Sequence, residues 1–248
     1  MENPSAPVVE TRLGALLGST EGDTHVWCGI PYAAPPVGPW RWRSPRPPAR
    51  WDGVRPATAF SASSWQSSES CQELGGGDPG QFSEDCLYLN VWSPAVRADP
   101  LPVMVWLHGG GFTLGAGGLP PYNGRALAKR GTVVVTINYR LGHLGFFAHP
   151  ALEGEEERVV HNFALLDQIQ ALEWVRDNIA AFGGDPENIT VFGESAGARS
   201  VLSLMASPLA GGLFHKAIVQ SGYTLPDTPR EQAMHKGEAI AAHFGLQN

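Results

Sequence analysis

An alternation of strand-like and helix-like segments, which begins at Leu87, constrains the fold of this chain most strongly. Runs of β-branched and aromatic residues alternate there with segments in which apolar residues recur at helical spacing. The expected strands are 87–92, 103–107, 132–137, 189–192 and 216–220, and the expected helices are 123–130, 162–182, one that contains residues 201–205, and 229–245. Strands that alternate with helices form a mostly parallel, doubly wound sheet, so we predict an α/β fold.

The first third of the chain has a different pattern. Residues 8–34 alternate short β-type runs with glycines, which predicts an antiparallel ribbon, and residues 35–51 are rich in Pro, Trp and Arg, which predicts an irregular but packed loop. Residues 61–83 are rich in Ser, Gly and Gln, so a mobile surface loop is expected. No internal repeat interrupts the chain, and we interpret residues 1–248 as a single domain.

Composition excludes several classes of protein. The hydrophobic share of 43% and the charged share of 17% are typical of a globular chain. The formal net charge of -7 argues against nucleic acid as a partner, because proteins that bind it concentrate Lys and Arg on one face. No segment is apolar for long enough to span a membrane, and the first residues do not resemble a secretory signal. A cytoplasmic location is therefore expected, with an extracellular one as the alternative if a leader was removed.

The three cysteines do not predict a metal site. Cys71 and Cys86 flank a Gly-rich loop and could close it as a disulfide in an oxidising compartment. Cys28 lies in an apolar strand-like run, where a buried, inert thiol is expected. None of the three has the spacing of metal ligands, and the sequence predicts neither a metal nor a cofactor.

The segment Gly193-Glu194-Ser195-Ala196-Gly197 carries the strongest chemical signal. It lies between a predicted strand and a predicted helix, where a tight turn exposes the Ser hydroxyl, and small neighbours let the backbone bend sharply. The helix that follows directs its N-terminal N–H groups toward the same point, which favours a developing negative charge. The alternative is a plain Gly-rich turn. The strand-to-helix context favours a nucleophile.

A second motif, His108-Gly109-Gly110-Gly111-Phe112, follows the predicted strand 103–107. Consecutive glycines let backbone amides approach a ligand closely, as the oxyanion hole of an acyl-transfer enzyme requires. The alternative is a flexible loop. Because the two motifs belong to one mechanism and occur in the expected order, we favour the catalytic interpretation.

The chain resembles the N-terminal half of a type-B carboxylesterase, the family that includes cholinesterases, from about residue 8 to its end. The stretches that carry the resemblance are Gly29-Ile30-Pro31-Tyr32-Ala33, Ser83-Glu84-Asp85-Cys86-Leu87-Tyr88-Leu89-Asn90, the HGGGF run, Asn138-Tyr139-Arg140-Leu141-Gly142, Phe182-Gly183-Gly184-Asp185-Pro186 and Phe192-Gly193-Glu194-Ser195-Ala196-Gly197. The resemblance implies an α/β-hydrolase fold and hydrolysis of a small-molecule carboxylic ester without a cofactor. Ser195 would be the acylated nucleophile, and the amides of Gly110, Gly111 and Ala196 would form the oxyanion hole.

The resemblance also implies structural pairings. Arg41 would pair with Glu84, and Arg140 would pair with Asp185. A Cys71–Cys86 bridge would be a family feature as well.

The acid and the histidine that would activate Ser195 come later in the chain of this family, so we expect a C-terminally incomplete sheet and an incomplete triad. Asp227, Glu231, His235 and His243 occur in the right order, but they share one short helical stretch and are expected at the surface. The remaining candidates are expected to be structural: His108, His149, His161 and His215. The strand 216–220 would be an exposed edge, through which the chain could self-associate.

Three functions are compatible with these observations. The first is a serine carboxylic-ester hydrolase that acts through an acyl-enzyme on Ser195. The second is a catalytically impaired fragment of such an esterase, and the third is a non-catalytic, cholinesterase-like interaction module. Ser195 and the intact run of glycines argue against the third.

Overall fold

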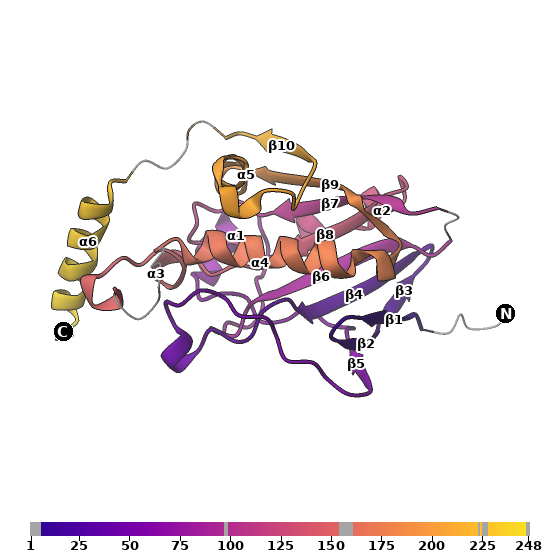
Figure 1. Cartoon of the computed structure of the whole chain (residues 1–248), viewed down its shortest axis with the longest axis horizontal. Helices are drawn as coiled ribbons and strands as arrows, with labels where there is room; N and C mark the ends of the chain where they lie inside the picture. Colours follow the sequence, from indigo (N-terminus) through magenta and orange to yellow (C-terminus); the bar gives the residue numbers. More distant parts are fainter. Residues whose placement is uncertain (1–5, 97–98, 154–160, 223, 225–227, 247–248) are drawn as a thin grey trace.

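The computed structural model describes residues 6–96, 99–153, 161–222, 224 and 228–246. Its centre is a seven-stranded sheet with the order β10-β9-β7-β8-β6-β4-β3, and a small sheet, β1-β2-β5, lies beside it (Figure 1). The strands are β1 (Val8–Thr11), β2 (Gly14–Leu17), β3 (Ser19–Glu21), β4 (Thr24–Pro31), β5 (Val54–Pro56), β6 (Tyr88–Pro94), β7 (Leu101–Leu107), β8 (Val133–Ile137), β9 (Gly184–Glu194) and β10 (Lys216–Gln220). The α-helices are α1 (Ser68–Glu73), α2 (Arg125–Ala128), α3 (Gly142–Gly145), α4 (Phe163–Asn178), α5 (Ala196–Ala206) and α6 (Arg230–His243). Short 3-10 helices cover Gly38–Trp40, Pro120–Tyr122, Pro150–Leu152, Ile179–Phe182 and Pro208–Ala210.

The direction of the strands confirms a mostly parallel sheet. Strands β10, β9, β7 and β8 are parallel to one another, and β6 and β4 extend the sheet by antiparallel pairing. Strand β4 therefore points the same way as the parallel group, whereas β6 and β3 point the opposite way. Within the expected antiparallel ribbon of residues 8–34, β3 pairs with β4 and β1 pairs with β2, both antiparallel.

Helices cover both faces of the sheet, as expected of a doubly wound fold. All five residues of β8 are buried, and alternate side chains along it point to opposite faces. Val133 and Val135 pack in the large core cluster with the α4 residue Leu172, whereas Val134 packs in a second cluster with Trp92 and the α2 residue Ala128. Figure 1 shows α4 and α5 lying across the near face of the sheet.

Helix α4 has the extent that its apolar spacing predicts. It begins at Phe163, and its last turn tightens into the 3-10 helix Ile179–Phe182. Gly183 then adopts φ 81°, the left-handed conformation that ends helices, and the chain enters β9. Helix α4 contacts both β9 and α5.

The segment expected to be a mobile loop, residues 61–83, contains helix α1. Ser67 caps this helix, since its side-chain oxygen accepts a hydrogen bond from the backbone N–H of Ser70 at 3.2 Å. Ser63 and Ser64 are buried, and the Ser63 hydroxyl donates to the carbonyl of Pro79 at 2.6 Å. Hydrogen bonds of these serine side chains therefore hold the segment in one conformation.

Of the two ion pairs that the family resemblance implied, one forms. Arg41 binds Glu84 through two hydrogen bonds. Arg140 instead binds Asp167 of α4, with Nε to Oδ2 at 2.8 Å and Nη2 to Oδ1 at 2.7 Å. The prediction of Asp185 was wrong because Asp185 caps its own turn, accepting from the backbone N–H of Glu187, while α4 places Asp167 beside the buried guanidinium.

The predicted Cys71–Cys86 bridge is also not formed, and the three cysteines are free and buried. Cys71 lies in a small cluster with Ala116 and Leu119, whereas Cys86 lies in the main core. Ser64 is the hydrogen-bond partner of the Cys86 thiol, and burial raises the pKa of that thiol to about 12. The disulfide that the cysteine pattern allowed is therefore absent from the structure.

Strand β10 forms one edge of the main sheet, and all five of its residues are exposed. In the part of the chain that the structure describes, no helix is long and apolar enough to cross a membrane.

Candidate active site

The backbone bends sharply at Ser195, between the end of β9 and the start of α5. Ser195 has φ 52° and ψ −116°, a conformation that non-glycine residues rarely adopt and that costs on the order of 1–3 kcal/mol. Two backbone hydrogen bonds hold the bend: the N–H of Ser195 donates to the carbonyl of Gln220 at 2.9 Å, and the N–H of Arg199 donates to the carbonyl of Ser195 at 3.0 Å. Ser195 remains partly exposed.

The glycines on both sides of Ser195 are required by close backbone approach. A Cβ atom on Gly193 would lie 2.6 Å from the carbonyl carbon of Gly197 and 2.8 Å from the carbonyl oxygen of Leu107. A Cβ atom on Gly197 would lie 2.7 Å from the carbonyl carbon of Leu107 and 2.8 Å from the carbonyl oxygen of His108. Real Cβ atoms do not approach backbone this closely, so the spacing of these glycines follows from packing against the end of β7.

The Gly-rich run after β7 lies against the same bend. Leu107 is paired with Gly193 in the sheet, so β7 and β9 end side by side. A Cβ atom on Gly109 would lie 3.4 Å from Cβ of Ser195, which places the two predicted motifs in contact. The run then turns through positive φ angles at Gly110 (102°) and Gly111 (61°), and the N–H of Leu114 donates to the carbonyl of Gly110 at 2.9 Å.

The amides of Gly110, Gly111 and Ala196 are available as donors. Within the described residues, none of these three N–H groups donates any of the loop, turn or cap hydrogen bonds between backbone groups. Ala196 is the first residue of α5, whose N-terminal N–H groups have no partner within the helix. Gly110 is partly exposed and Gly111 is exposed, so a ligand at Ser195 could reach this loop.

Gln66 holds the far end of the Gly-rich run, a contact that sequence reasoning missed. Its side-chain oxygen accepts from the N–H of Gly115 at 2.7 Å, and its side-chain nitrogen donates to the carbonyl of Gly115 at 2.8 Å. The Gln66 amide and the Gly115 backbone thus exchange two hydrogen bonds, as two paired residues of neighbouring strands do. Nothing in the local sequence marks this glutamine, because its partner is 49 residues away.

Among the candidate acids and bases that the structure describes, none forms a hydrogen bond with the Ser195 side chain. Asp227 falls outside the described residues, whereas Glu231, His235 and His243 are exposed on α6, as expected. The other histidines have structural contacts: His149 accepts from the N–H of Ala151, His215 accepts from the N–H of Ile189, and His161 lies 3.7 Å from Glu153. Throughout the described part of the chain, no histidine forms a hydrogen bond with the Ser195 side chain.

The residues that the structure describes include no group of three or more His, Cys, Asp or Glu side chains that could hold a metal ion.

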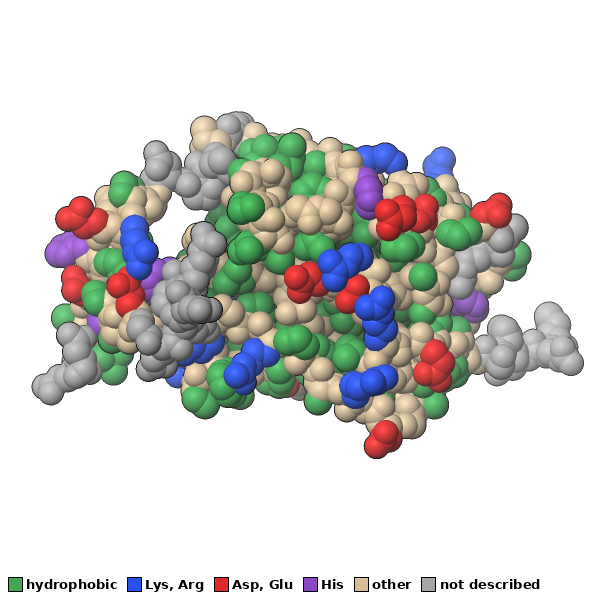
Figure 2. All heavy atoms as spheres, in the orientation of Figure 1, with side chains coloured by type: hydrophobic (Ala, Val, Ile, Leu, Met, Phe, Trp, Pro, Cys, Tyr) green, Lys and Arg blue, Asp and Glu red, His purple; other side chains and the backbone are tan. Residues whose placement is uncertain are grey.

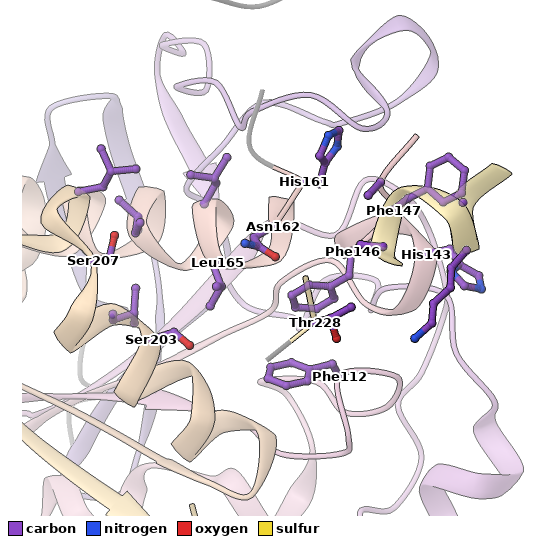
Figure 3. Close-up of a pocket in the computed structure, with 18 of the residues that line it drawn as sticks. Phe112, His143, Phe146, Phe147, His161, Asn162, Leu165, Ser203, Ser207 and Thr228 are labelled. Atoms are coloured by element: carbon purple, nitrogen blue, oxygen red, sulfur yellow. The ribbon is translucent and has the colours of Figure 1, made fainter. Parts of the chain in front are cut away.

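A cavity of about 650 Å³ lies between α6 and the body of the protein, beside the candidate site. Phe112, which directly follows the glycines, forms part of its wall and packs against Phe146, with ring centroids 5.0 Å apart. Figure 3 shows Leu165 of α4 and Ser203 of α5 on the side opposite His143 and Phe147. Figure 2 shows hydrophobic side chains on the wall that faces α6. Ser195 does not line this cavity, so the site is defined by the bend and the glycines.

Comparisons with known proteins agree on one family. Residues 5–248 match the model of the Carboxylesterase family. The chain is 50% identical to the para-nitrobenzyl esterase of Bacillus subtilis (strain 168) over 96% of its own length and 48% of that protein, and 46% identical to carboxylesterase 1C of Rattus norvegicus over 98% of its own length and 46% of that protein. Among solved structures, a thermophilic PNB esterase superposes with a TM-score of 0.90 at 47% identity, covering 98% of this chain and 49% of that one.

The chain therefore spans about half the length of the curated relatives it matches. Because the family model covers nearly all of its residues and the structural likeness is close, the α/β-hydrolase fold is confirmed, and this chain belongs to the carboxylesterase family.

Proposed function

We propose that this chain carries the nucleophile and the oxyanion hole of a serine carboxylic-ester hydrolase. The Oγ atom of Ser195 attacks the carbonyl carbon of a small-molecule ester and gives a tetrahedral intermediate. The bond to the alcohol oxygen then breaks, the alcohol leaves with a proton, and an acyl group remains on Ser195. Attack by water on this acyl-enzyme releases the carboxylic acid and restores the serine.

The contact between the bend at Ser195 and the Gly-rich run carries this proposal. Gly109 lies against Ser195, and this contact supports the assignment of the amides of Gly110, Gly111 and Ala196 to the oxyanion hole. The positive end of the α5 macrodipole faces the same space and favours a negative oxygen there. In enzymes of this type, loss of one such donor raises the barrier by about 2.7–4 kcal/mol. The esterase names of the relatives are consistent with this assignment.

The proposed reaction also needs a general base, because a serine hydroxyl is a weak nucleophile at neutral pH. Since no described histidine contacts Ser195, we assign to these residues the nucleophilic and anion-stabilising parts of the reaction. A site that lacks triad members but retains its oxyanion hole can still exceed the uncatalysed reaction by about 10³–10⁴-fold.

Covalent labelling tests the proposal directly. The folded chain is treated with a fluorophosphonate probe, the adduct is located by mass spectrometry, and hydrolysis of p-nitrophenyl acetate is followed in parallel. We expect one adduct, on Ser195, and no adduct in Ser195→Ala. The matched control is Ser203→Ala, which removes a partly buried hydroxyl from the same helix and should label like the unchanged chain. A folded sample without an adduct at Ser195 would contradict the assignment.

A further inference from the structure

His108 is the first residue after β7 and is completely buried. Its ring stacks on the ring of Tyr139, with centroids 4.3 Å apart and planes inclined by 10°. The Tyr139 hydroxyl donates to the carbonyl oxygen of His108 at 2.6 Å. Tyr139 therefore fixes both the ring and the backbone of the residue that precedes the glycines.

The contacts of the His108 ring determine its tautomer. The Nδ1 atom lies 2.9 Å from the carbonyl oxygen of Gly109, and a carbonyl oxygen can only accept, so Nδ1 carries the hydrogen. The Nε2 atom is buried and has no partner among the described residues. Burial lowers the pKa of His108 to about 4, although the bond to Gly109 acts in the opposite direction, so the ring is neutral at neutral pH.

The hydrogen bond to Gly109 bears on the amide of Gly110. The carbonyl of Gly109 and the N–H of Gly110 belong to one planar peptide unit and point in opposite directions. Glycine permits many backbone conformations, and Gly109 and Gly110 are adjacent, so this peptide plane could rotate unless something held it. In the structure, the Nδ1–H of His108 holds the carbonyl end of the plane.

We propose that His108 is a positioning residue, whose Nδ1–H group fixes the Gly109–Gly110 peptide plane and thereby aims the Gly110 amide at the oxyanion. This inference rests on the proposed function, because it assigns a purpose to an amide of the oxyanion hole. It gives His108, which the sequence predicted to be structural, a role in the candidate active site. The imidazole acts through hydrogen-bond direction and exchanges no proton with substrate.

Two amide substitutions separate positioning from packing. The side-chain nitrogen of His108→Asn can occupy the place of Nδ1 and donate to Gly109, whereas that of His108→Gln corresponds to Nε2. The volume of Gln is closer to that of His, so if His108 acted only through packing, the Gln variant would be less affected than the Asn variant. We expect the Asn variant to react with a fluorophosphonate within about threefold of the unchanged chain, and the Gln variant to react about 10²–10³-fold more slowly, the effect of losing one oxyanion donor. Thermal unfolding of both variants is measured in parallel.

A Gln variant that reacts as fast as the Asn variant would overturn the inference, as would losses in both variants that follow their losses of stability. Nuclear magnetic resonance gives a readout that needs no reaction. We expect ¹⁵N shifts of the Nδ1–H tautomer at neutral pH, and a Gly110 amide resonance that is retained in His108→Asn and displaced in His108→Gln.

The two readouts distinguish failure of this inference from failure of the proposed function. If Ser195 is never labelled but the tautomer and the Gly110 resonances behave as expected, the proposed function fails while the positioning by His108 stands. An Nε2–H tautomer, or a Gly110 resonance that is equally displaced in both variants, contradicts the role of His108 whether or not Ser195 reacts.

Discussion

Replacing Asp167 with asparagine should leave the guanidinium of Arg140 charged, buried and without its counter-ion. In the structure, the side chains of Arg140 and Asp167 are 2% and 0% exposed. The carboxylate accepts from the backbone N–H, Nε and Nη2 of Arg140 at 3.1, 2.8 and 2.7 Å. The pair joins α4 to the segment that follows β8.

The expected cost follows from the burial of both charges. Breaking a buried ion pair by removing one partner costs about 3–5 kcal/mol, because the remaining charge has no compensation. In a chain of this length each kcal/mol shifts the unfolding temperature by about 2–4 °C, so we expect a fall of roughly 6–20 °C. The matched control is Asp185→Asn. Among the described residues, the Asp185 side chain accepts a hydrogen bond from the N–H of Glu187. An asparagine oxygen can also accept this bond, so the cost of Asp185→Asn should be within about 0.5 kcal/mol.

Urea unfolding followed by far-ultraviolet circular dichroism measures both variants against the unchanged chain. A loss below about 1 kcal/mol for Asp167→Asn would refute the assignment of this pair as the buried one. Equal losses in the two variants would do the same, because they would restore Asp185 as a partner of Arg140.

Three further predictions follow from other contacts. Gly197→Ala should destabilise the fold by about 1–3 kcal/mol, because the new methyl group meets the backbone of Leu107 and His108, and thermal unfolding would contradict this if the variant were as stable as the unchanged chain. Burial lowers the pKa of His108 from 6.5 to about 4, so between these values the unfolded chain binds a proton that the folded chain does not bind. The contribution of His108 to stability should therefore be constant above about pH 6.5 and fall by about 3 kcal/mol toward pH 4. Urea titrations should show a smaller fall in His108→Asn, and an identical fall would exclude this histidine as the cause. Val219→Lys, on the exposed edge β10, should reduce any self-association seen by sedimentation velocity, whereas an unchanged distribution would place the contact elsewhere.

Local sequence patterns predicted the main strands and helices of the sheet, but not every end of them. The apolar, β-branched run of β8 and the helical spacing of α4 are set by residues within each element, so the sequence alone reveals them. Strand β9 begins several residues before its apolar core, at Gly184, because it pairs there with Leu101 of β7. A partner in another part of the chain sets that boundary, and spacing within one element does not contain it.

The same distinction applies to the candidate site. The nucleophile segment could be identified because a strand, a tight turn and a helix are adjacent in sequence. Helix α1 also had a local signal, the serine cap at Ser67, which the Ser-rich composition of its loop concealed. In contrast, the contacts of Gln66 with Gly115, of Asp167 with Arg140 and of Ser64 with Cys86 join distant segments. Only the folded arrangement reveals them.

The hydrogen bond from the Ser195 amide to Gln220 ties the nucleophile segment to the outermost strand of the sheet. Whatever displaces or reinforces β10, including another polypeptide that binds along it, will alter the restraint on this strained backbone. The rate at which a covalent probe labels Ser195 should therefore change when another polypeptide binds along the sheet edge. Labelling of this one residue would then also detect assembly.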